Sequence, residues 1–274
     1  MRTSILLAAL MLTLPGCRKE RIDVDNLLGG DVIVQGHGGM GIHSLYPLDS
    51  PASVLACLHS GADGVEVDVQ LSKDSVLVAF HDEDLSVSTD MSGAVVDHTW
   101  AELSTARFVG PNYTEHRLMR LDQFMDQLGD PGRFHWSLDL KPYPSTVPEG
   151  EYLNRFARAV ARLINDRGLS ERCYLESQQT YLLLGIRQHL PSARLFIYPA
   201  DFAQGYADAT VNGLSGISID MAKITREQVE QAHASGLWVT VWNAQNRDDN
   251  TDALRLGPEI IQSDRVEHLV DLMD

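Results

Sequence analysis

The fold of this chain is constrained most by a regular alternation of short β-rich runs with amphipathic helical patterns. Eight runs predict strands, over residues 32–36, 64–71, 134–140, 172–176, 194–198, 216–219, 237–242 and 260–262. The helical patterns cover residues 51–60, 121–128, 151–167, 179–189, 202–209, 225–234, 248–256 and 265–273. Eight strands that alternate with helices in this way favour an α/β fold, the (β/α)8 TIM barrel.

A doubly wound open sheet is the alternative architecture for the same alternation. It usually contains fewer units, and its first turn carries a glycine-rich fingerprint for dinucleotides. Glycines follow the first predicted strand at positions 36, 38, 39 and 41, but His37 lies among them and the fingerprint spacing is absent. The barrel is therefore the preferred prediction.

One stretch interrupts the alternation. Residues 73–120 contain no long helical pattern, only a β-rich run over 76–80 and a polar stretch after it. Because this stretch follows the second strand, it would lie on the face of the barrel where active sites form. We therefore predict a small insertion after strand two.

The N-terminus has the pattern of an export signal. Arg2 precedes an apolar run over residues 5–14, and Gly16 and Cys17 follow it. The run is too short to span a bilayer stably. A Cys directly after a small residue resembles the processing site of bacterial lipoproteins, where the lipidated Cys becomes the mature N-terminus; an ordinary cleaved signal is the alternative. We predict a lipoprotein-type signal peptide over 1–16, lipidation of Cys17, a tether over 17–30 and one domain over 31–274.

These predictions describe an exported bacterial lipoprotein, anchored to a membrane, whose body is periplasmic or on the cell surface. No later segment has about 20 uninterrupted apolar residues, so contact with the membrane would be through the N-terminal lipid anchor alone. The formal net charge of −16 at pH 7 argues against nucleic acid, because binding to phosphate backbones requires clustered Lys and Arg. No pattern in the sequence indicates a protein partner.

The most informative segment for function covers residues 61–82. Valines at positions 65, 67 and 69 alternate with Glu66 and Asp68, so the predicted strand has an apolar face and a face with two acids. Two carboxylates side by side repel each other and are tolerated mainly where a cation lies between them. His81 ends the next β-rich run and adds proton transfer near neutral pH. The segment predicts half of a metal-assisted active site.

The other half follows from the barrel, because reactive groups gather at the C-terminal ends of parallel barrel strands. Besides Glu66 and Asp68, the strand ends carry His37, Asp139, Lys141, Glu176 and Trp242. Carboxylates at 66, 68 and 139 would form an all-oxygen site, which suits Ca²⁺ or Mg²⁺ better than Zn²⁺. Two histidines and a lysine around such an ion suit phosphoryl chemistry, since imidazoles move protons and the ammonium offsets anionic charge.

On these residues the chain resembles the glycerophosphodiester phosphodiesterase family, from residue 32 to the C-terminus. The block over 61–82 is the most specific match. The weaker matches occur in the family order: Gly36-His37-Gly38-Gly39, Tyr46-Pro47-Leu48-Asp49-Ser50, Leu138-Asp139-Leu140-Lys141, Val241-Trp242-Asn243 and Ile260-Ile261-Gln262-Ser263-Asp264.

The resemblance implies a (β/α)8 barrel with an insertion after strand two. It implies a phosphoric diester hydrolase that uses a divalent cation, Ca²⁺ or Mg²⁺, to hydrolyse small glycerophosphodiesters to sn-glycerol 3-phosphate and an alcohol. By position, it assigns the metal to Glu66, Asp68 and Asp139, acid–base catalysis to His37 as the acid and His81 as the base, and the phosphate and glycerol pocket to Lys141 and Trp242. Glu176 is a further candidate for substrate binding.

Three positions depart from the family pattern. Gly38 stands where the family usually has Arg, Leu48 stands where it has Glu, and Asp139 replaces a Glu. Phosphate binding would then rest on the metal, on Lys141 and on glycine backbone amides, which leaves the substrate preference open. Two alternative functions remain: a phospholipase D-type lyase that gives cyclic phosphates, and a non-catalytic surface lipoprotein that binds phosphodiesters.

Overall fold

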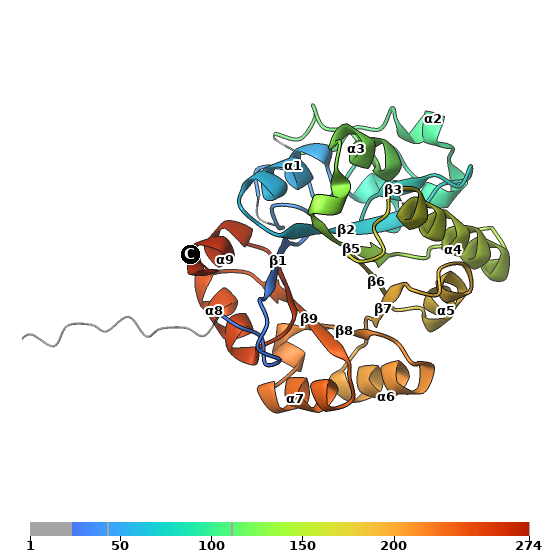
Figure 1. Cartoon of the computed structure of the whole chain (residues 1–274). Helices are drawn as coiled ribbons and strands as arrows, with labels where there is room; N and C mark the ends of the chain where they lie inside the picture. Colours follow the sequence, from blue (N-terminus) through green and yellow to red (C-terminus); the bar gives the residue numbers. More distant parts are fainter. Residues whose placement is uncertain (1–23, 43, 111, 274) are drawn as a thin grey trace, which may run out of the picture.

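The computed structural model describes residues 24–42, 44–110 and 112–273, and the predicted signal peptide and Cys17 lie outside them. Within the described residues, eight parallel strands close into a barrel, in the order β1-β2-β5-β6-β7-β8-β9-β10 with β10 paired back to β1 (Figure 1). The barrel strands are β1 (Ile33–Gly36), β2 (Gly64–Leu71), β5 (His135–Leu140), β6 (Cys173–Ser177), β7 (Arg194–Ile197), β8 (Gly216–Asp220), β9 (Trp238–Ala244) and β10 (Ile260–Ser263). The predicted TIM barrel is confirmed.

Helices surround the barrel as an outer layer (Figure 1). They are α1 (Pro51–His59), α3 (Leu121–Gln127), α4 (Glu149–Asp166), α5 (Thr180–His189), α6 (Phe202–Asn212), α7 (Arg226–Ala234), α8 (Arg247–Leu256) and α9 (Val266–Met273). Each helix predicted from the sequence is present, with ends shifted by a few residues. None of the helices in the described ranges has the length and apolar character needed to cross a membrane.

Strand β2 carries two acids into the barrel. All of its residues are buried, and its valines belong to the main core between barrel and helices. Strands of a parallel barrel are covered on both faces in this way. Glu66 and Asp68 therefore lie inside the barrel and not on a solvated strand face.

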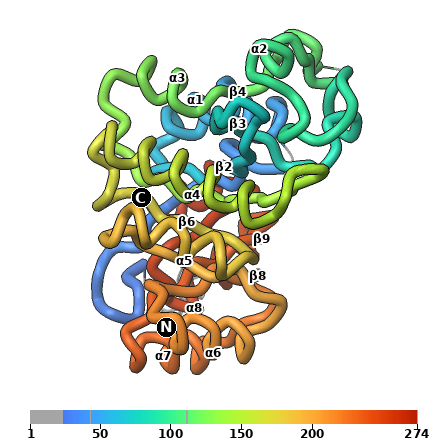
Figure 2. The backbone as a smooth tube through the Cα atoms, turned by 90° about the vertical axis from the view of Figure 1, so that its right-hand side faces the viewer, coloured from blue at the N-terminus to red at the C-terminus, as the bar shows by residue number. Residues whose placement is uncertain are grey.

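The insertion after β2 folds around a small apolar core of its own. Strand β3 (Leu77–Ala79) runs antiparallel to the end of β2, and β4 (Met119–Arg120) pairs antiparallel with β3. Between them the chain forms short helices, including α2 (Trp100–Leu103), over buried side chains such as Phe80 and Phe108. Figure 2 shows the insertion projecting from one side of the barrel. The predicted polar stretch thus contains a core, which the sequence concealed because its apolar residues follow neither the strand nor the helix period.

The last part of the predicted tether packs on the barrel. Asn26 closes a turn, since its Oδ1 accepts hydrogen bonds from Leu28 N at 2.9 Å and from Gly30 N at 3.1 Å. Leu27 N donates to Gly257 O at 3.0 Å. The described end of the predicted tether is therefore held against the α8–β10 loop by this bond.

Candidate active site

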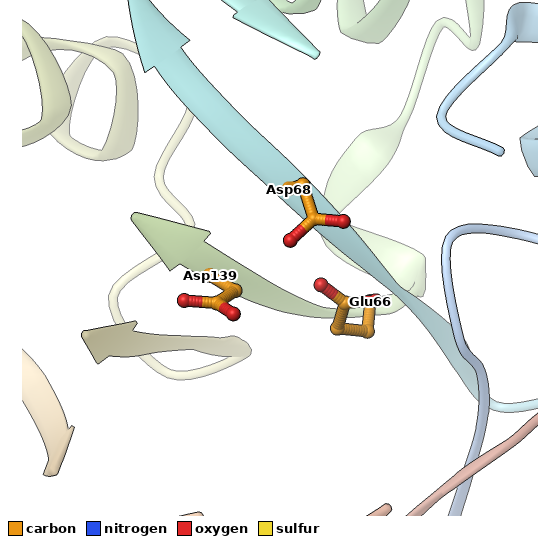
Figure 3. Close-up of side chains that lie close together, drawn as sticks. All are labelled: Glu66, Asp68 and Asp139. Atoms are coloured by element: carbon orange, nitrogen blue, oxygen red, sulfur yellow. The ribbon is translucent and has the colours of Figure 1, made fainter. Parts of the chain in front are cut away.

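Three carboxylates meet at the C-terminal end of the barrel. Glu66 and Asp68 come from β2 and Asp139 comes from β5, where parallel pairing sets Asp139 opposite Asp68. Figure 3 shows their carboxylate groups turned toward one another from the two strands. One oxygen from each lies within 4.8 Å of the others, and all three side chains are buried. The structure thus brings together the three residues that the sequence predicted as metal ligands.

Lys141 is paired directly with two of these carboxylates. Lys141 Nζ lies 2.6 Å from Asp139 Oδ2 and 3.1 Å from Asp68 Oδ1. Asp68 Oδ2 is buried and accepts no hydrogen bond from the residues that the structure describes. When all three carboxylates are ionised, their charge exceeds that of Lys141 and a protonated His37 together, and buried charge without a partner is strongly unfavourable. The all-oxygen donor set and this excess of charge fit a hard divalent cation such as Ca²⁺ or Mg²⁺.

The pKa values of the three acids shift in different directions. Burial, followed by the charges of Asp68 and Asp139, raises the pKa of Glu66 well above its usual value. Burial also raises the pKa of Asp139, against the opposing charge of Lys141. For Asp68 the nearby positive groups, Lys141 first, outweigh burial and lower the pKa. Despite burial, the carboxylates of Asp68 and Asp139 hold the pKa of Lys141 above its usual range, so this residue is an ammonium ion.

His37 is held beside the cluster by a buried acid. Its Nδ1 lies 2.8 Å from Asp264 Oδ1, and its Nε2 faces Glu66 Oε2 at 4.0 Å. Burial lowers the pKa of His37, but the hydrogen bond to Asp264 and the surrounding acids outweigh it and raise the pKa overall. The sequence analysis did not select Asp264. It directly follows β10, so the strand-end rule that selected His37 would also have found it.

The loop between β1 and α1 is tied by hydrogen bonds to strand β2, which carries Glu66 and Asp68. Gly38 N donates to Glu66 Oε2 at 2.8 Å, and Asp68 N donates to Asp49 Oδ1 at 3.0 Å. Burial and the charges of Asp68 and Glu66 raise the pKa of Asp49 well above its usual value. Asp49 was not selected from the sequence, and no local pattern signals a contact with a backbone amide 19 residues away.

Two of the three departures from the family pattern, Gly38 and Leu48, are neighbours in space. Gly38 adopts a φ of +56°, and a Cβ atom on it would lie 2.6 Å from Leu48 Cδ2. A side chain at position 38 would therefore collide with Leu48, in a backbone conformation that already favours glycine.

His81 approaches the site from the insertion. Its Nδ1 lies 3.0 Å from Asp82 Oδ1, and its side chain is half exposed. Asp82 Oδ2 in turn accepts a short hydrogen bond from Ser88 Oγ. The backbone here is tied to β2, because Gln70 Nε2 donates to Phe80 O at 2.8 Å and to Asp82 O at 2.7 Å. His81 is thus oriented by a carboxylate at the mouth of the site, whereas His37 is oriented by one in its interior.

An aromatic wall lies beside the cluster. The ring centroid of Trp242 is 6.4 Å from that of His37 and 5.2 Å from that of Tyr198. Lys141 Nζ lies 5.6 Å from the Tyr198 ring centroid. Trp242 Nε1 is buried and has no hydrogen-bond partner among the residues that the structure describes. Tyr198 directly follows β7, and the strand-end rule could have found it too.

Glu176 occupies a different position from the other predicted residues. Its Oε2 accepts from Ser218 Oγ and its Oε1 accepts from Gln262 Nε2, both at 2.7 Å. Burial, followed by the charge of Asp139, raises its pKa to about 7. Each oxygen of Glu176 thus accepts a hydrogen bond from a barrel side chain, which gives it a supporting position; the substrate-binding role expected for it stays a prediction.

Comparisons with known proteins identify the family of this chain. The Glycerophosphoryl diester phosphodiesterase family matches residues 41–268. A glycerophosphodiester phosphodiesterase of Caldanaerobacter subterraneus subsp. tengcongensis is 24% identical over 231 residues, which cover 83% of this chain and 92% of that protein. The fold resembles that of a putative glycerophosphodiester phosphodiesterase from Galdieria sulphuraria, with a TM-score of 0.75 at 21% identity, covering 93% of this chain and 100% of the other. An Oleispira antarctica phosphodiesterase, solved in complex with the product sn-glycerol-3-phosphate, gives a TM-score of 0.75 at 19% identity, covering 88% and 96%. Since the family match spans most of the chain, this protein belongs to the glycerophosphoryl diester phosphodiesterase family of phosphoric diester hydrolases.

Proposed function

We propose that this protein hydrolyses glycerophosphodiesters to sn-glycerol 3-phosphate and an alcohol, with a divalent cation held by Glu66, Asp68 and Asp139. The observation that carries the proposal is the buried cluster of three carboxylates, which outnumber the two positive groups beside them, Lys141 and His37. The related Oleispira antarctica phosphodiesterase was solved with sn-glycerol-3-phosphate, which supports the same product here. When bound, Ca²⁺ or Mg²⁺ would polarise the phosphate oxygens and offset their charge.

His37 is suited to be the general acid. A carboxylate accepts hydrogen bonds, so Nδ1–H of His37 donates to Asp264 and Nε2 is the atom that faces the cluster. The raised pKa of His37 favours the protonated ring, with a proton on Nε2. That proton can pass to the departing alkoxide.

His81 is suited to be the general base. Its Nδ1–H donates to Asp82, which leaves the lone pair of Nε2 free in the neutral ring. The half-exposed position lets Nε2 take a proton from a water molecule or from the 2-hydroxyl group of the substrate glycerol. Attack of water on phosphorus, with loss of the protonated alcohol, gives sn-glycerol 3-phosphate directly. Attack of the 2-hydroxyl group releases the same alcohol and gives a cyclic phosphate, which a water molecule must then open to sn-glycerol 3-phosphate.

Lys141 and Trp242 are suited to bind the substrate. The ammonium group of Lys141 adds positive charge beside the carboxylates, where a phosphate would lie. Trp242 offers its unpaired Nε1–H and a ring face to the glycerol end. Glu176 would support the barrel below Asp139.

Product analysis by phosphorus NMR tests this proposal. The purified protein, supplied with Ca²⁺ or Mg²⁺, should convert glycerophosphocholine to sn-glycerol 3-phosphate. His37→Ala and Glu66→Gln should abolish turnover, whereas His189→Ala, which removes an exposed histidine on α5, should leave it unchanged. Full activity in either site variant would contradict the assignment. A cyclic phosphate as the final product would favour the lyase alternative, and saturable binding without turnover would favour the non-catalytic one.

We also propose that the protein is an exported lipoprotein anchored through Cys17, with its body periplasmic or on the cell surface. The support is the signal pattern over 1–16 and the Cys directly after it. In cell fractionation, the wild-type protein should be found with membranes and Cys17→Ser should be released into the soluble exported fraction. Equal membrane association of both would contradict the anchor.

A further inference from the structure

A cavity of about 250 Å³ opens beside His81, between the β1–α1 loop and the insertion. One edge is polar and belongs to the proposed active site, because it includes His81, Asp82 and Asp49. Asp49 is buried and accepts a hydrogen bond from the backbone amide of Asp68. His81, the proposed general base, lies on the same edge, so a molecule in the cavity would lie beside it.

Apolar side chains line much of the rest of the wall, beside the hydroxyl groups of two tyrosines and a serine. Leu48, Phe108 and Tyr113 line it, and no Lys or Arg is among the described residues around it. Leu48 stands where the resembled family has Glu, and its side chain lies over Gly38. A carboxylate at this position would place charge in the wall, and covering that charge with hydrocarbon would cost free energy. Leu48 avoids this cost.

The apolar character continues to the surface around the cavity. Ile42, Val87 and Val109 all line it, and their side chains are 46%, 65% and 46% exposed. They come from segments far apart in the chain, one from the β1–α1 loop and two from the insertion. Single exposed apolar residues are ordinary, but a group of them around a cavity marks a binding surface for an apolar group.

We infer that this cavity binds a hydrocarbon chain of the substrate, so that the preferred substrates are amphiphilic phosphodiesters. The inference rests on the proposed function. The cavity is smaller than the pockets that enclose drug-sized ligands, so it accepts a short chain or the first carbons of a longer one. Val87 and Val109 would cover the next carbons. The chain can belong to the leaving alcohol or to the glycerol, as in a lysophospholipid, because both place hydrocarbon close to the same phosphate.

A substrate series tests the inference and separates these two sources. Esters of glycerol 3-phosphate with methanol, butanol and octanol vary the leaving alcohol, and glycerophosphocholine against lysophosphatidylcholine varies the glycerol end. We expect kcat/KM to rise about two- to fourfold for each methylene that becomes buried, in one of the two comparisons. Flat kcat/KM in both, or a choline ester that outperforms the alkyl esters, would overturn the inference. Hydrolysis of all esters at equal rates would leave the proposed function intact.

Variants of the exposed valines identify the cavity as the cause. Val87→Ser and Val109→Ser should each lower the ratio of kcat/KM for octyl over methyl ester several-fold. Val211→Ser is the matched control, since Val211 is 83% exposed on α6, away from the cavity. If Val211→Ser lowers this ratio of kcat/KM as much as Val87→Ser and Val109→Ser do, the inference is overturned.

Calorimetry with monomeric octylphosphocholine gives a readout that does not need turnover. The wild-type protein should bind it more tightly than Val87→Ser does, and equal affinity would overturn the inference even in a protein that hydrolyses nothing. Absence of hydrolysis with normal binding would instead contradict only the proposed function.

Discussion

Replacing Asp264 with Asn tests how the reactivity of His37 is set. The substitution keeps the shape of a fully buried side chain and removes its charge. Asp264 Oδ1 lies 2.8 Å from His37 Nδ1, and this contact is the largest of the effects that raise the pKa of His37 against burial. Hydrogen bonds to charged groups contribute about 1.5–3 kcal/mol. If that stabilisation serves the reaction, Asp264→Asn should lower kcat/KM about 10- to 150-fold.

The pH dependence of this variant should change in a defined direction. As the proposed acid, His37 is active in its protonated form, so activity is lost as the pH rises through its pKa. An uncharged amide in place of the carboxylate should lower that pKa. The alkaline decline of kcat/KM in Asp264→Asn should therefore begin at a lower pH than in the wild type. Release of sn-glycerol 3-phosphate measured from about pH 5 to about pH 9 gives the rate and the profile together.

A control separates this effect from damage to the fold. Asp201→Asn changes an exposed acid that caps α6 by accepting from Gln204 N at 3.0 Å, and Asn caps a helix about as well. It should keep the wild-type rate and profile. An Asp264→Asn protein that melts like the wild type and also keeps both would refute the proposed positioning of His37.

Three further predictions concern the metal ligands, the β1–α1 loop and the second histidine. Burial raises the pKa of Glu66 and of Asp139, so protons compete with the cation for these carboxylates. Calorimetry should show that the affinity for the metal falls as the pH is lowered and that protons are released on binding. An affinity that does not depend on pH would refute this. Gly38→Ala puts a Cβ 2.6 Å from Leu48 Cδ2 at a φ of +56°, so urea unfolding should show a free energy of unfolding lower by about 1–3 kcal/mol. Gly150→Ala is the control: it lies in α4 with open space around it and should not destabilise the protein. Ser88→Ala removes the hydroxyl that donates to Asp82 and should lower kcat about two- to tenfold through a less ordered His81; an unchanged kcat would show that Ser88 plays no part.

Much of the site was predictable because a parallel barrel turns sequence position into spatial position. Each barrel strand ends at the same rim, so residues at strand ends meet whatever their separation in the chain. This rule alone connects Glu66 and Asp68 on β2 with Asp139 on β5, and it applies equally to Asp264 after β10. Asp264 directly follows the last strand, so its place at this rim is predictable in the same way.

Other features depend on contacts that no local pattern reports. Asp49 lies in a loop with a φ of +58°, and only the folded chain brings it to the amide of Asp68. The apolar cavity beside His81 forms where the insertion meets the β1–α1 loop, two segments with no shared periodicity. The strand-end rule places Glu176 at the end of β6. Its hydrogen-bond partners Ser218 and Gln262 come from other strands, so no pattern around Glu176 in the sequence reveals these contacts.

On our proposal, phosphodiester hydrolysis by this protein requires a divalent cation at the carboxylate cluster. The most direct measurement is the release of sn-glycerol 3-phosphate from glycerophosphocholine while Ca²⁺ or Mg²⁺ is titrated into protein stripped by a chelator. The cluster of Glu66, Asp68 and Asp139 predicts no release in chelator and a saturable return of activity with one cation bound per chain. Full activity in the stripped protein would contradict it.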